Sequence, residues 1–567
     1  MQVNELFRQS NTILLDGGMG TMLQAAGLKL GARPEELNIT DPALIEGIHG
    51  QYAAAGSRIV NANTFGASAH KLAGSAYTLE QVITAGIENC KRACADVYKR
   101  QALDVGPLGE LLEPNGTLAF EDAVAEYGRI VRAGVAAGAD LVFFETFTDL
   151  YELKAALLAA KENSTLPILA SMSFEAGGRT FTGCTVESFA VTARGLGANA
   201  VGINCSLGPK EIFPMAKRLA EAVPGNFPVF VKPNAGLPRA DGSGYDITPQ
   251  LFALQMKPYR ELHLFAAGGC CGTTPEFIKL LNGTFAGCTP GRPAHRMPSV
   301  LCTPVDTVTV DGITVVGERI NPTGKKRFQQ ALREGDMNYV LEQAVSQAEA
   351  GAQILDVNVG APGVDEPVLM EQVVKALQSV TSLPLQLDSS NVEALARGLR
   401  VYNGKPIVNS ADAGSRISYI DLAAANDAIC IALCSADGIA KDNEERMMHC
   451  HHMLERGLSL GMEATDLWFD PLFLVVKGMQ DKQMDVLNAI KLFSDEGLKS
   501  TGGLSNNSNG APKNVRPIMD SALVAMAMMQ GLTSAIVNPN DLRLMETIKS
   551  CDIFKNNELY SDSYLDA

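Results

Sequence analysis

The sequence lacks both a long hydrophobic run and an excess of basic residues. No stretch of about 18 apolar residues occurs anywhere. The first residues, MQVNELFRQSNTILLDGG, have neither the basic nor the apolar region of a secretory signal. The formal net charge is −16, which argues against a general nucleic-acid binder because phosphate binding needs clustered Lys and Arg. These absences exclude a membrane protein and predict a cytoplasmic one.

Cysteine is also sparse, at 12 of 567 residues. This is too few for a disulfide framework in so long a chain, and a reducing compartment keeps such residues as thiols. Most of them stand singly or at helical spacing in apolar surroundings, where we expect small buried side chains. The chain is longer than one hydrophobic core usually organises, so two or at most three domains are expected.

Short β-rich runs that end in Gly, Asn, Asp or Pro alternate with helical patterns along the whole chain. The first eight runs are TILLDGG, RIVNANTFG, ALDVGP, LVFFETF, PILASMSF, AVGINCS, PVFVKPNAG and HLFAAGGCCG. The next eight are ITVVGERIN, QILDVNVG, PLQLDSS, PIVNS, AICIALCS, LWFDP, LKSTGGLSN and SAIVNPND. Eight strand-helix units predict a (β/α)₈ barrel. We therefore predict an α/β fold with two TIM barrels in tandem, residues 1–285 and 313–567, joined by a Pro/Gly-rich linker at 286–312.

Three thiols fall at the carboxyl ends of two predicted strands of the first barrel. Cys205 closes the sixth run, and Cys270 and Cys271 close the eighth. The chemistry of such barrels lies at these strand ends, and only one strand separates the sixth from the eighth. Three thiolates with an open fourth position are typical of a catalytic zinc site that binds a further thiol. The alternative is that a Cys-Cys pair in a Gly-rich loop only packs small side chains.

Two acids on the same rim indicate what else the thiol substrate carries. Asp16 and Glu145 end the first and fourth runs and suit an ammonium group. The Gly17-Gly18 turn offers backbone N–H groups to a carboxylate. An amino acid that bears a thiol fits both features. For each acid the alternative is a salt bridge at a strand end.

The second barrel ends its strands in carboxylates and amides, with no His or Lys among them. The residues are Glu318, Asn321, Asp356, Asn358, Asp388, Asn409, Ser435, Asp470, Asn506 and Asn538. Ionised Asp accepts paired N–H bonds and Asn both donates and accepts, which suits a flat heterocycle such as a pterin. The alternative is that these residues only cap the following helices.

A histidine cluster in the second half gives no comparable prediction. The run ERMMHCHHMLERG holds His449, His451 and His452 within a polar helical pattern. We interpret it as a solvated helix surface and not as a metal site.

The first-barrel motifs LDGGMGT, NANTFGAS, FFETF, GINCS and GGCCGTTPEFI resemble the homocysteine S-methyltransferase family. The resemblance covers the whole first barrel and implies homocysteine as the thiol. It also implies Cys205, Cys270 and Cys271 as zinc ligands, which agrees with the reading of the residues alone. The substrate contacts that it implies are Asp16, Gly17, Thr64 and Glu145.

The second-barrel motifs VVGERIN, LDVN, LDSS, VNS, FDP and GLSN resemble pterin-binding methyltransferases that use methyltetrahydrofolate. The pterin contacts that this resemblance implies are Glu318, Asn321, Asp356, Asn358, Asp388, Asn409, Asp470 and Asn506. The loop GLSNNSNGAPKNVRP departs from methionine-synthase-like sequences, because its first Arg is Arg516. It is closer to the corrinoid/iron-sulfur-protein methyltransferases of acetogens, and Arg516 is a candidate pterin or tail contact.

Together the two barrels resemble the N-terminal half of the corrinoid-dependent methionine synthases. N5 of methyltetrahydrofolate is a poor leaving group without a polar contact, for which Asn506 is the candidate. A corrinoid is expected to carry the methyl group between the sites, since a thiolate takes it poorly. The sequence holds no D-x-H-x-x-G cobalamin-binding signature, so the cobalamin is expected on another domain or protein. Two alternatives remain: a fusion with another methyl donor or corrinoid partner, and a binding scaffold without turnover.

Overall fold

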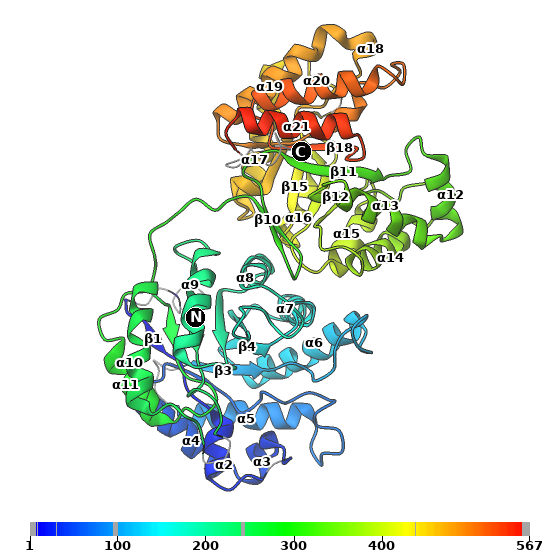
Figure 1. The fold of residues 1–567 in the computed structure, drawn as a ribbon. Coiled ribbons are helices and arrows are strands. Elements are labelled where there is room, and N and C mark those ends of the chain that lie inside the picture. The colour runs from blue at the N-terminus through cyan, green and yellow to red at the C-terminus, as the bar shows by residue number, and fades with distance from the viewer. Residues whose placement is uncertain are drawn as a thin grey trace. The chain divides into compact units, whose positions relative to one another are not determined.

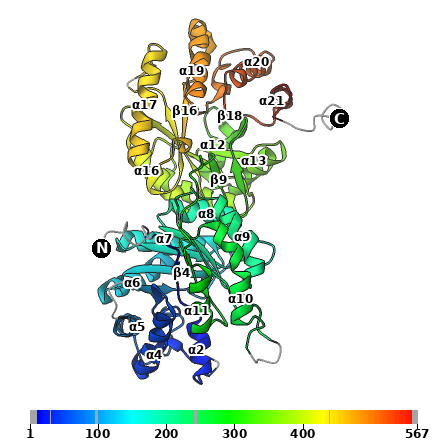
Figure 2. The same ribbon diagram turned by 90° about the vertical axis from the view of Figure 1, so that its left-hand side faces the viewer.

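The computed structural model describes residues 7, 10–29, 31–94, 100–239, 244–436 and 438–557. The chain divides into two compact units, Met1–Arg296 and Met297–Ala567. The segment expected as a linker, residues 286–312, contains this division. Each unit has strands at its centre and helices around them (Figures 1 and 2).

The first unit is a parallel eight-stranded sheet in the order β1-β8-β7-β6-β5-β4-β3-β2. Its strands are β1 (Ile13–Leu14), β2 (Ile59–Asn61), β3 (Arg100–Val105), β4 (Leu141–Phe147), β5 (Ile168–Met172), β6 (Ala200–Asn204), β7 (Val229–Lys232) and β8 (Ala266–Ala267). The two ends of the sheet meet where Arg58 N–H donates to Leu14 O over 2.7 Å. The barrel is therefore nearly closed, and each of these strands overlaps a predicted run; β3 begins two residues before its run.

Helices follow the strands of the first unit in alternation. They are α2 (Met19–Ala25), α3 (Leu37–Thr40), α4 (Pro42–Ala55), α5 (Leu79–Ala93), α6 (Phe120–Ala137), α7 (Leu150–Asn163), α8 (Val186–Gly195), α9 (Pro209–Glu221), α10 (Pro249–Gln255) and α11 (Pro275–Thr284). Residues at the helix ends determine where these helices begin and end. Thr78 and Gln81 form a capping box at the start of α5. Gly138 ends α6 in the left-handed conformation that favours glycine, with φ 80°.

The second unit repeats the architecture, with the strand order β17-β16-β15-β14-β13-β12-β11-β18. Its strands are β11 (Thr314–Ile320), β12 (Ile354–Val357), β13 (Leu385–Asp388), β14 (Ile407–Asp412), β15 (Ile429–Leu433), β16 (Leu467–Asp470), β17 (Lys499–Ser500) and β18 (Ser534–Val537). A hydrogen bond from Ile536 N–H to Gly502 O, 2.9 Å long, joins the ends of the sheet. The prediction of two tandem α/β barrels is confirmed.

The helices of the second unit also alternate with its strands. They are α12 (Lys326–Glu334), α13 (Met337–Glu349), α14 (Glu366–Gln378), α15 (Val392–Val401), α16 (Ser418–Ala425), α17 (Asn443–Ser459), α18 (Val476–Met479), α19 (Gln483–Asp495), α20 (Arg516–Met529) and α21 (Leu542–Phe554). A short 3₁₀ helix, η5 (Leu504–Asn506), lies between β17 and α20.

A hairpin that the sequence reading assigned to the linker covers the amino-terminal end of the second barrel. It consists of β9 (Val300–Cys302) and β10 (Thr307–Thr309), paired antiparallel. Leu301 packs in one buried cluster with side chains of the barrel strands, including Trp468. The Trp468 indole N–H donates to Ser299 Oγ over 2.9 Å. Because this segment is rich in Thr and Pro, the sequence did not predict these two strands. Their apolar residues cover the end of the barrel.

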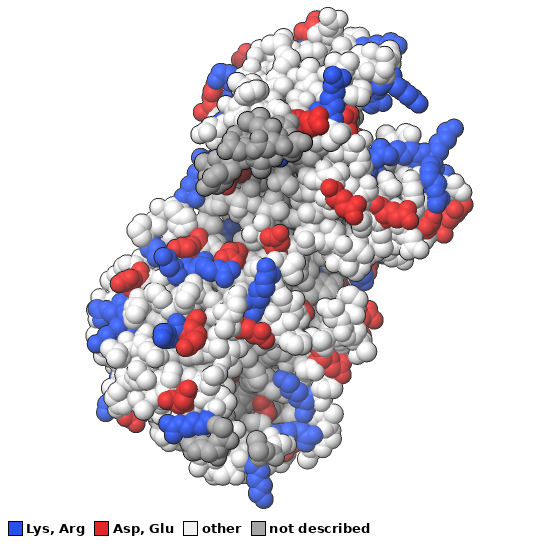
Figure 3. Space-filling view, viewed as in Figure 1, with Lys and Arg blue, Asp and Glu red and all other residues white. Residues whose placement is uncertain are grey.

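Charged residues of both signs are interspersed on the face shown in Figure 3. Within the described ranges, no helix is long and apolar enough to cross a membrane. Eight cysteines outside the predicted zinc site are buried: Cys90, Cys94, Cys184, Cys288, Cys302, Cys430, Cys434 and Cys450. Cys551 is partly exposed.

Candidate active sites

The first barrel brings its three predicted thiols together at the carboxyl ends of β6 and β8. Their sulfur atoms all lie within 4.8 Å of one another, and the Sγ atoms of Cys205 and Cys271 are 3.9 Å apart. Both loops attach to the intervening strand end: Cys205 N–H donates to Lys232 O over 3.1 Å and Cys270 N–H to Pro233 O over 2.9 Å. The strand between them therefore sets the spacing of the cluster.

The backbone at the thiol cluster is strained. Cys205 and Ser206 have φ values of 64° and 59°, in the left-handed region that residues with a Cβ seldom adopt. Amide side chains brace the cluster: Cys271 N–H donates to Asn234 Oδ1 over 3.0 Å, and Asn204 Nδ2 lies 3.8 Å from Cys270 Sγ. A strained backbone of this kind persists only where surrounding contacts hold it in place, and it is common at active sites.

The electrostatics of the three thiols favour a cation. Hydrogen bonds from Cys270 and Cys271 lower the pKa of Cys205 to about 3. Hydrogen bonding to Cys205 raises the pKa of Cys271 to about 11. By itself the cluster thus holds one thiolate. Tetrahedral zinc with Zn–S bonds of about 2.3 Å needs sulfurs about 3.8 Å apart, and the Cys205–Cys271 spacing of 3.9 Å fits this requirement. Among the described residues, no other group of three His, Cys, Asp or Glu side chains has a metal-binding arrangement.

The predicted acids of the first rim are not free carboxylates. Lys232, at the end of β7, places its ammonium 2.8 Å from Glu145 Oε2 and 3.3 Å from Asp16 Oδ1. Asp16 Oδ2 also accepts a hydrogen bond from Asn61 N–H over 2.7 Å. The salt-bridge alternative is therefore observed, between residues that also lie on the rim. The sequence reading missed Lys232, which is the last residue of an otherwise apolar strand.

A third buried acid, Asp104 on β3, belongs to the same cluster. Burial raises the pKa of Asp16 to about 6 and the pKa of Asp104 well above its usual range. Although burial lowers the pKa of Lys232, the carboxylates of Glu145, Asp16 and Asp104 raise it well above its ordinary value. Lys232 is therefore charged at neutral pH, and Asp104 keeps its proton to a higher pH than an exposed aspartate does.

Gly17 and Thr64, the other predicted substrate contacts, are buried at the same end of the barrel. A Cβ at Gly17 would lie 2.7 Å from Thr273 Oγ1, so this position requires glycine. The Gly18 N–H is used by Thr273 O, 3.3 Å away. Thr64 Oγ1 donates to Asp104 O over 2.8 Å and accepts from Asp104 N–H over 3.1 Å. The Thr64 hydroxyl thus braces β3.

The second rim is a network in which acids and amides bond to one another. Asp356 Oδ1 accepts from Gln386 Nε2 over 2.6 Å and from Asn409 Nδ2 over 3.3 Å. Asn358 Nδ2 donates to Asp388 Oδ2 over 3.0 Å. Asp388 and Asn409 are register partners in adjacent strands. The structure thus brings these predicted contacts together.

Several rim residues brace their own loops, but they do not cap helices. Asn321 Oδ1 accepts from Thr323 N–H over 2.9 Å, Asn358 Oδ1 from Gly360 N–H over 2.9 Å and Asp470 Oδ1 from Leu472 N–H over 2.7 Å. Other residues hold the N-cap positions of α14, α15, α17 and α21, namely Asp365, Asn391, Asp442 and Asp541. The helix-capping alternative is therefore wrong for these rim residues.

A lysine from outside the strand ends also reaches the second rim. Lys325 Nζ donates to Glu318 O over 2.9 Å. Burial lowers the pKa of Lys325. The reading missed Lys325 because it lies in the loop after β11 and not at the strand end.

Glu318 also connects to the loop after β17. Ser505 Oγ donates to Glu318 Oε2 over 2.5 Å, while the next residue, Asn506, is exposed. Arg516, the first residue of α20, donates to Ser508 Oγ over 3.2 Å and to Asn509 Oδ1 over 3.1 Å. Arg516 therefore braces the loop that carries Asn506.

Burial dominates the protonation of the second rim. It raises the pKa of Asp388 to about 6 and that of Asp470 to about 7. Burial and the nearby Asp388 raise the pKa of Asp356 well above its usual range. The rim can thus present protonated and ionised carboxyl groups side by side, which can bind both acceptors and donors of a heterocycle.

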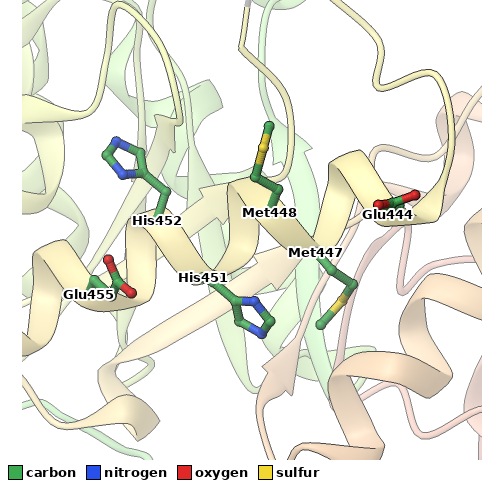
Figure 4. Close-up of a pocket in the computed structure, with 6 residues that line it drawn as sticks. All are labelled: Glu444, Met447, Met448, His451, His452 and Glu455. Carbon is green, nitrogen blue, oxygen red and sulfur yellow. The ribbon is translucent and has the colours of Figure 1, made fainter.

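The histidine cluster lies along α17, where Glu444, Met447, Met448, His451, His452 and Glu455 line an open hollow. Figure 4 shows His451 and His452 on different sides of the helix. His451 Nε2 lies 2.9 Å from Glu496 Oε2, and both side chains are exposed. The histidines do not converge on one point.

Comparison with known families matches each barrel separately. Residues 13–285 match the homocysteine S-methyltransferase family and residues 317–538 match the pterin binding enzyme family. Each match covers less than half of the chain, and the two matches follow one another along it. This order corresponds to the homocysteine- and folate-binding half of the methionine synthases, which confirms the resemblance identified from the motifs.

The chain is also similar to individual proteins. The chain is 29% identical to methionine synthase from Mycobacterium leprae, over 93% of this chain and 47% of that protein. It is also 29% identical to methionine synthase from Mycobacterium tuberculosis, over 94% of this chain and 48% of that protein. The chain thus spans about half the length of these relatives. The metallated homocysteine methyltransferase MmuM from Escherichia coli is 22% identical over 50% of this chain and 98% of its own, with a TM-score of 0.43.

Proposed function

We propose that this chain catalyses two half-reactions of methyl transfer from 5-methyltetrahydrofolate to homocysteine. The first barrel binds zinc and homocysteine, and the second barrel binds methyltetrahydrofolate. A corrinoid held by another domain or protein carries the methyl group between them. The observation that supports the proposal most strongly is the convergence of three sulfurs within 4.8 Å at one barrel mouth, in a domain of the homocysteine S-methyltransferase family.

In the first barrel, Cys205, Cys270 and Cys271 would hold the zinc through their sulfur atoms. Zinc in a three-thiolate site lowers the pKa of a further thiol and so supplies a nucleophilic sulfur at neutral pH. Glu145 and Asp16 lie on the same rim, both buried, and would bind the substrate ammonium. The backbone at Cys205 is in the left-handed conformation, and its sulfur lies within 4.8 Å of those of Cys270 and Cys271.

In the second barrel, the rim residues would bind the pterin through paired hydrogen bonds. Asp356 and Asp388 supply carboxyl groups, while Asn358 and Asn409 fix their orientation. Asn506 is exposed on the loop after β17 and would supply the polar contact to N5. That contact stabilises the changing charge on nitrogen as the methyl group leaves.

Two separate assays test the proposal on zinc-loaded protein. Methylcobalamin with homocysteine should give methionine, and cob(I)alamin with methyltetrahydrofolate should give tetrahydrofolate. Absence of the first product would contradict the assignment of the first barrel, and absence of the second product would contradict that of the second barrel. Binding of both substrates without either product would favour a scaffold.

A further inference from the structure

We propose that Lys232 is a positioning and specificity residue, which holds Asp16 and Glu145 so that the first barrel accepts a thiol that also carries an ammonium group. The proposal rests on the function proposed above for the first barrel. It assigns a role to a buried residue that neither the sequence motifs nor the zinc chemistry explains.

The Lys232 ammonium contacts both Asp16 and Glu145. It lies 2.8 Å from Glu145 Oε2, 3.3 Å from Asp16 Oδ1 and 5.1 Å from the centre of the Phe143 ring. Lys232 is only 2% exposed, so water cannot replace these contacts. A buried ion pair in such a position fixes the orientation of both carboxylates.

The register of the sheet places this ion cluster beside the thiols. Lys232 on β7 pairs with Asn204 on β6, and Cys205 follows Asn204 directly. One small molecule can therefore place its sulfur at the cysteines and its ammonium at the acids. The two functional groups of an amino acid with a thiol side chain would then be bound by adjacent strand ends.

The contacts of the cluster leave carboxylate oxygens for a further cation. Asp16 and Glu145 share the single ammonium group of Lys232. Asp16 Oδ2 is occupied by Asn61 N–H. Among the described residues, no hydrogen bond engages Glu145 Oε1. Glu145 Oε1 and Asp16 Oδ1, a buried oxygen without a hydrogen-bond partner, are therefore the acceptors for the substrate ammonium, and Lys232 prevents repulsion between the two acids.

The second barrel provides a matched control in Lys405. Its ammonium lies 2.8 Å from Asp466 Oδ1 and 3.3 Å from Asp427 Oδ1, and it is 3% exposed. Lys405, however, precedes β14 and lies at the amino-terminal end of its barrel. Residues at that end of a TIM barrel serve stability, whereas those at the other end serve catalysis.

The test measures binding of two thiols to the zinc-loaded full chain by titration calorimetry. Homocysteine is compared with 4-mercaptobutyrate, which has the same thiol and carboxylate but no ammonium. Lys232→Met should weaken homocysteine binding by roughly 10-fold or more. The same variant should change 4-mercaptobutyrate binding less than about threefold and retain its zinc. Lys405→Met should lower the melting temperature and leave both affinities unchanged.

Equal losses for the two thiols in Lys232→Met, or no loss for either, would overturn the role of Lys232. Lys232→Arg, which keeps the charge, should retain the preference for homocysteine. Loss of that preference in a folded Lys232→Arg protein would also overturn the proposal. Failure of the unaltered protein to bind zinc or homocysteine would instead contradict the proposed function of the first barrel.

Discussion

The two barrels use the same strand ends in different ways. The rim of the first barrel gathers three sulfurs and a lysine held between carboxylates. The rim of the second barrel gathers acids and amides that bond mainly to one another. The first set suits a soft metal and a charged amino acid, and the second suits a neutral heterocycle with many donors. The fold therefore supplies positions, and the residue types at the strand ends decide the chemistry.

Removal of one thiol should give the largest difference between the two rims, because it affects the function of the first barrel alone. Cys270→Ala should reduce the zinc content from about one ion per chain to near zero and abolish methylation of homocysteine. Affinity for methyltetrahydrofolate, which concerns the other rim, should not change. Metal analysis and folate titration measure both effects. Cys551→Ala is the matched control, since Cys551 lies on α21 outside the cluster, and it should keep its zinc. Full zinc occupancy in Cys270→Ala would refute the metal site.

Substitution of an acid on the second rim should lower folate affinity and leave the zinc site of the first barrel unaffected. In Asp356→Asn, an amide replaces a carboxyl group that accepts hydrogen bonds from Gln386 and Asn409. Affinity for methyltetrahydrofolate should fall roughly 10- to 100-fold, while zinc content and homocysteine binding stay constant. The exposed Asp495, which pairs with Lys491, gives the control variant Asp495→Asn. Unchanged folate affinity in Asp356→Asn would remove Asp356 from the proposed site.

The strands and the thiols could be predicted from the sequence because their signals are local. Each strand is a short apolar run that ends at Gly, Asn, Asp or Pro, and the barrel topology then brings Cys205 next to Cys270 and Cys271. Lys232 could not be predicted, because its partners Asp16 and Glu145 are distant in sequence. Its position as the last residue of an apolar strand gave the only available signal.

Two other features depended on tertiary packing. The hairpin β9–β10 lies in a segment rich in Pro, Gly and Thr, and Leu301 and Val310 are buried against the apolar end of the second barrel. The lysine between Asp16 and Glu145 was not predicted for the same reason, since nothing in the sequence indicated a buried counter-ion. Local patterns therefore predicted where the sites lie but not how their charges are balanced.

The two units should also respond differently to acid, beginning with His49 in α4. His49 is fully buried, neither ring nitrogen has a hydrogen-bond partner, and burial lowers its pKa to about 4. The unfolded chain takes up the proton near pH 6.5, so the folded first unit loses stability as the pH falls below that value. His49→Leu removes this loss. Its stability relative to the unaltered protein should rise by about 2 kcal/mol between pH 7.5 and pH 5, measured by urea unfolding. Parallel stability curves would contradict the prediction.

Asp470 on the second rim should show an effect of opposite sign. Burial raises its pKa to about 7, so the folded state keeps the proton to a higher pH than the unfolded chain does. The stability that this proton confers is present in acid and is lost as the pH rises toward 7. Asp470→Asn should therefore gain stability relative to the unaltered protein as the pH is raised from 4 to 8. A gain on acidification instead would show that Asp470 is ionised in the folded protein.

X-ray absorption at the zinc edge tests the central claim most directly. The unaltered protein should show three sulfur ligands at about 2.3 Å, and addition of homocysteine should add a fourth sulfur at a similar distance. Methyltetrahydrofolate, which concerns the other rim, should leave the spectrum unchanged. A zinc shell without sulfur, or a spectrum that homocysteine does not alter, would contradict the account.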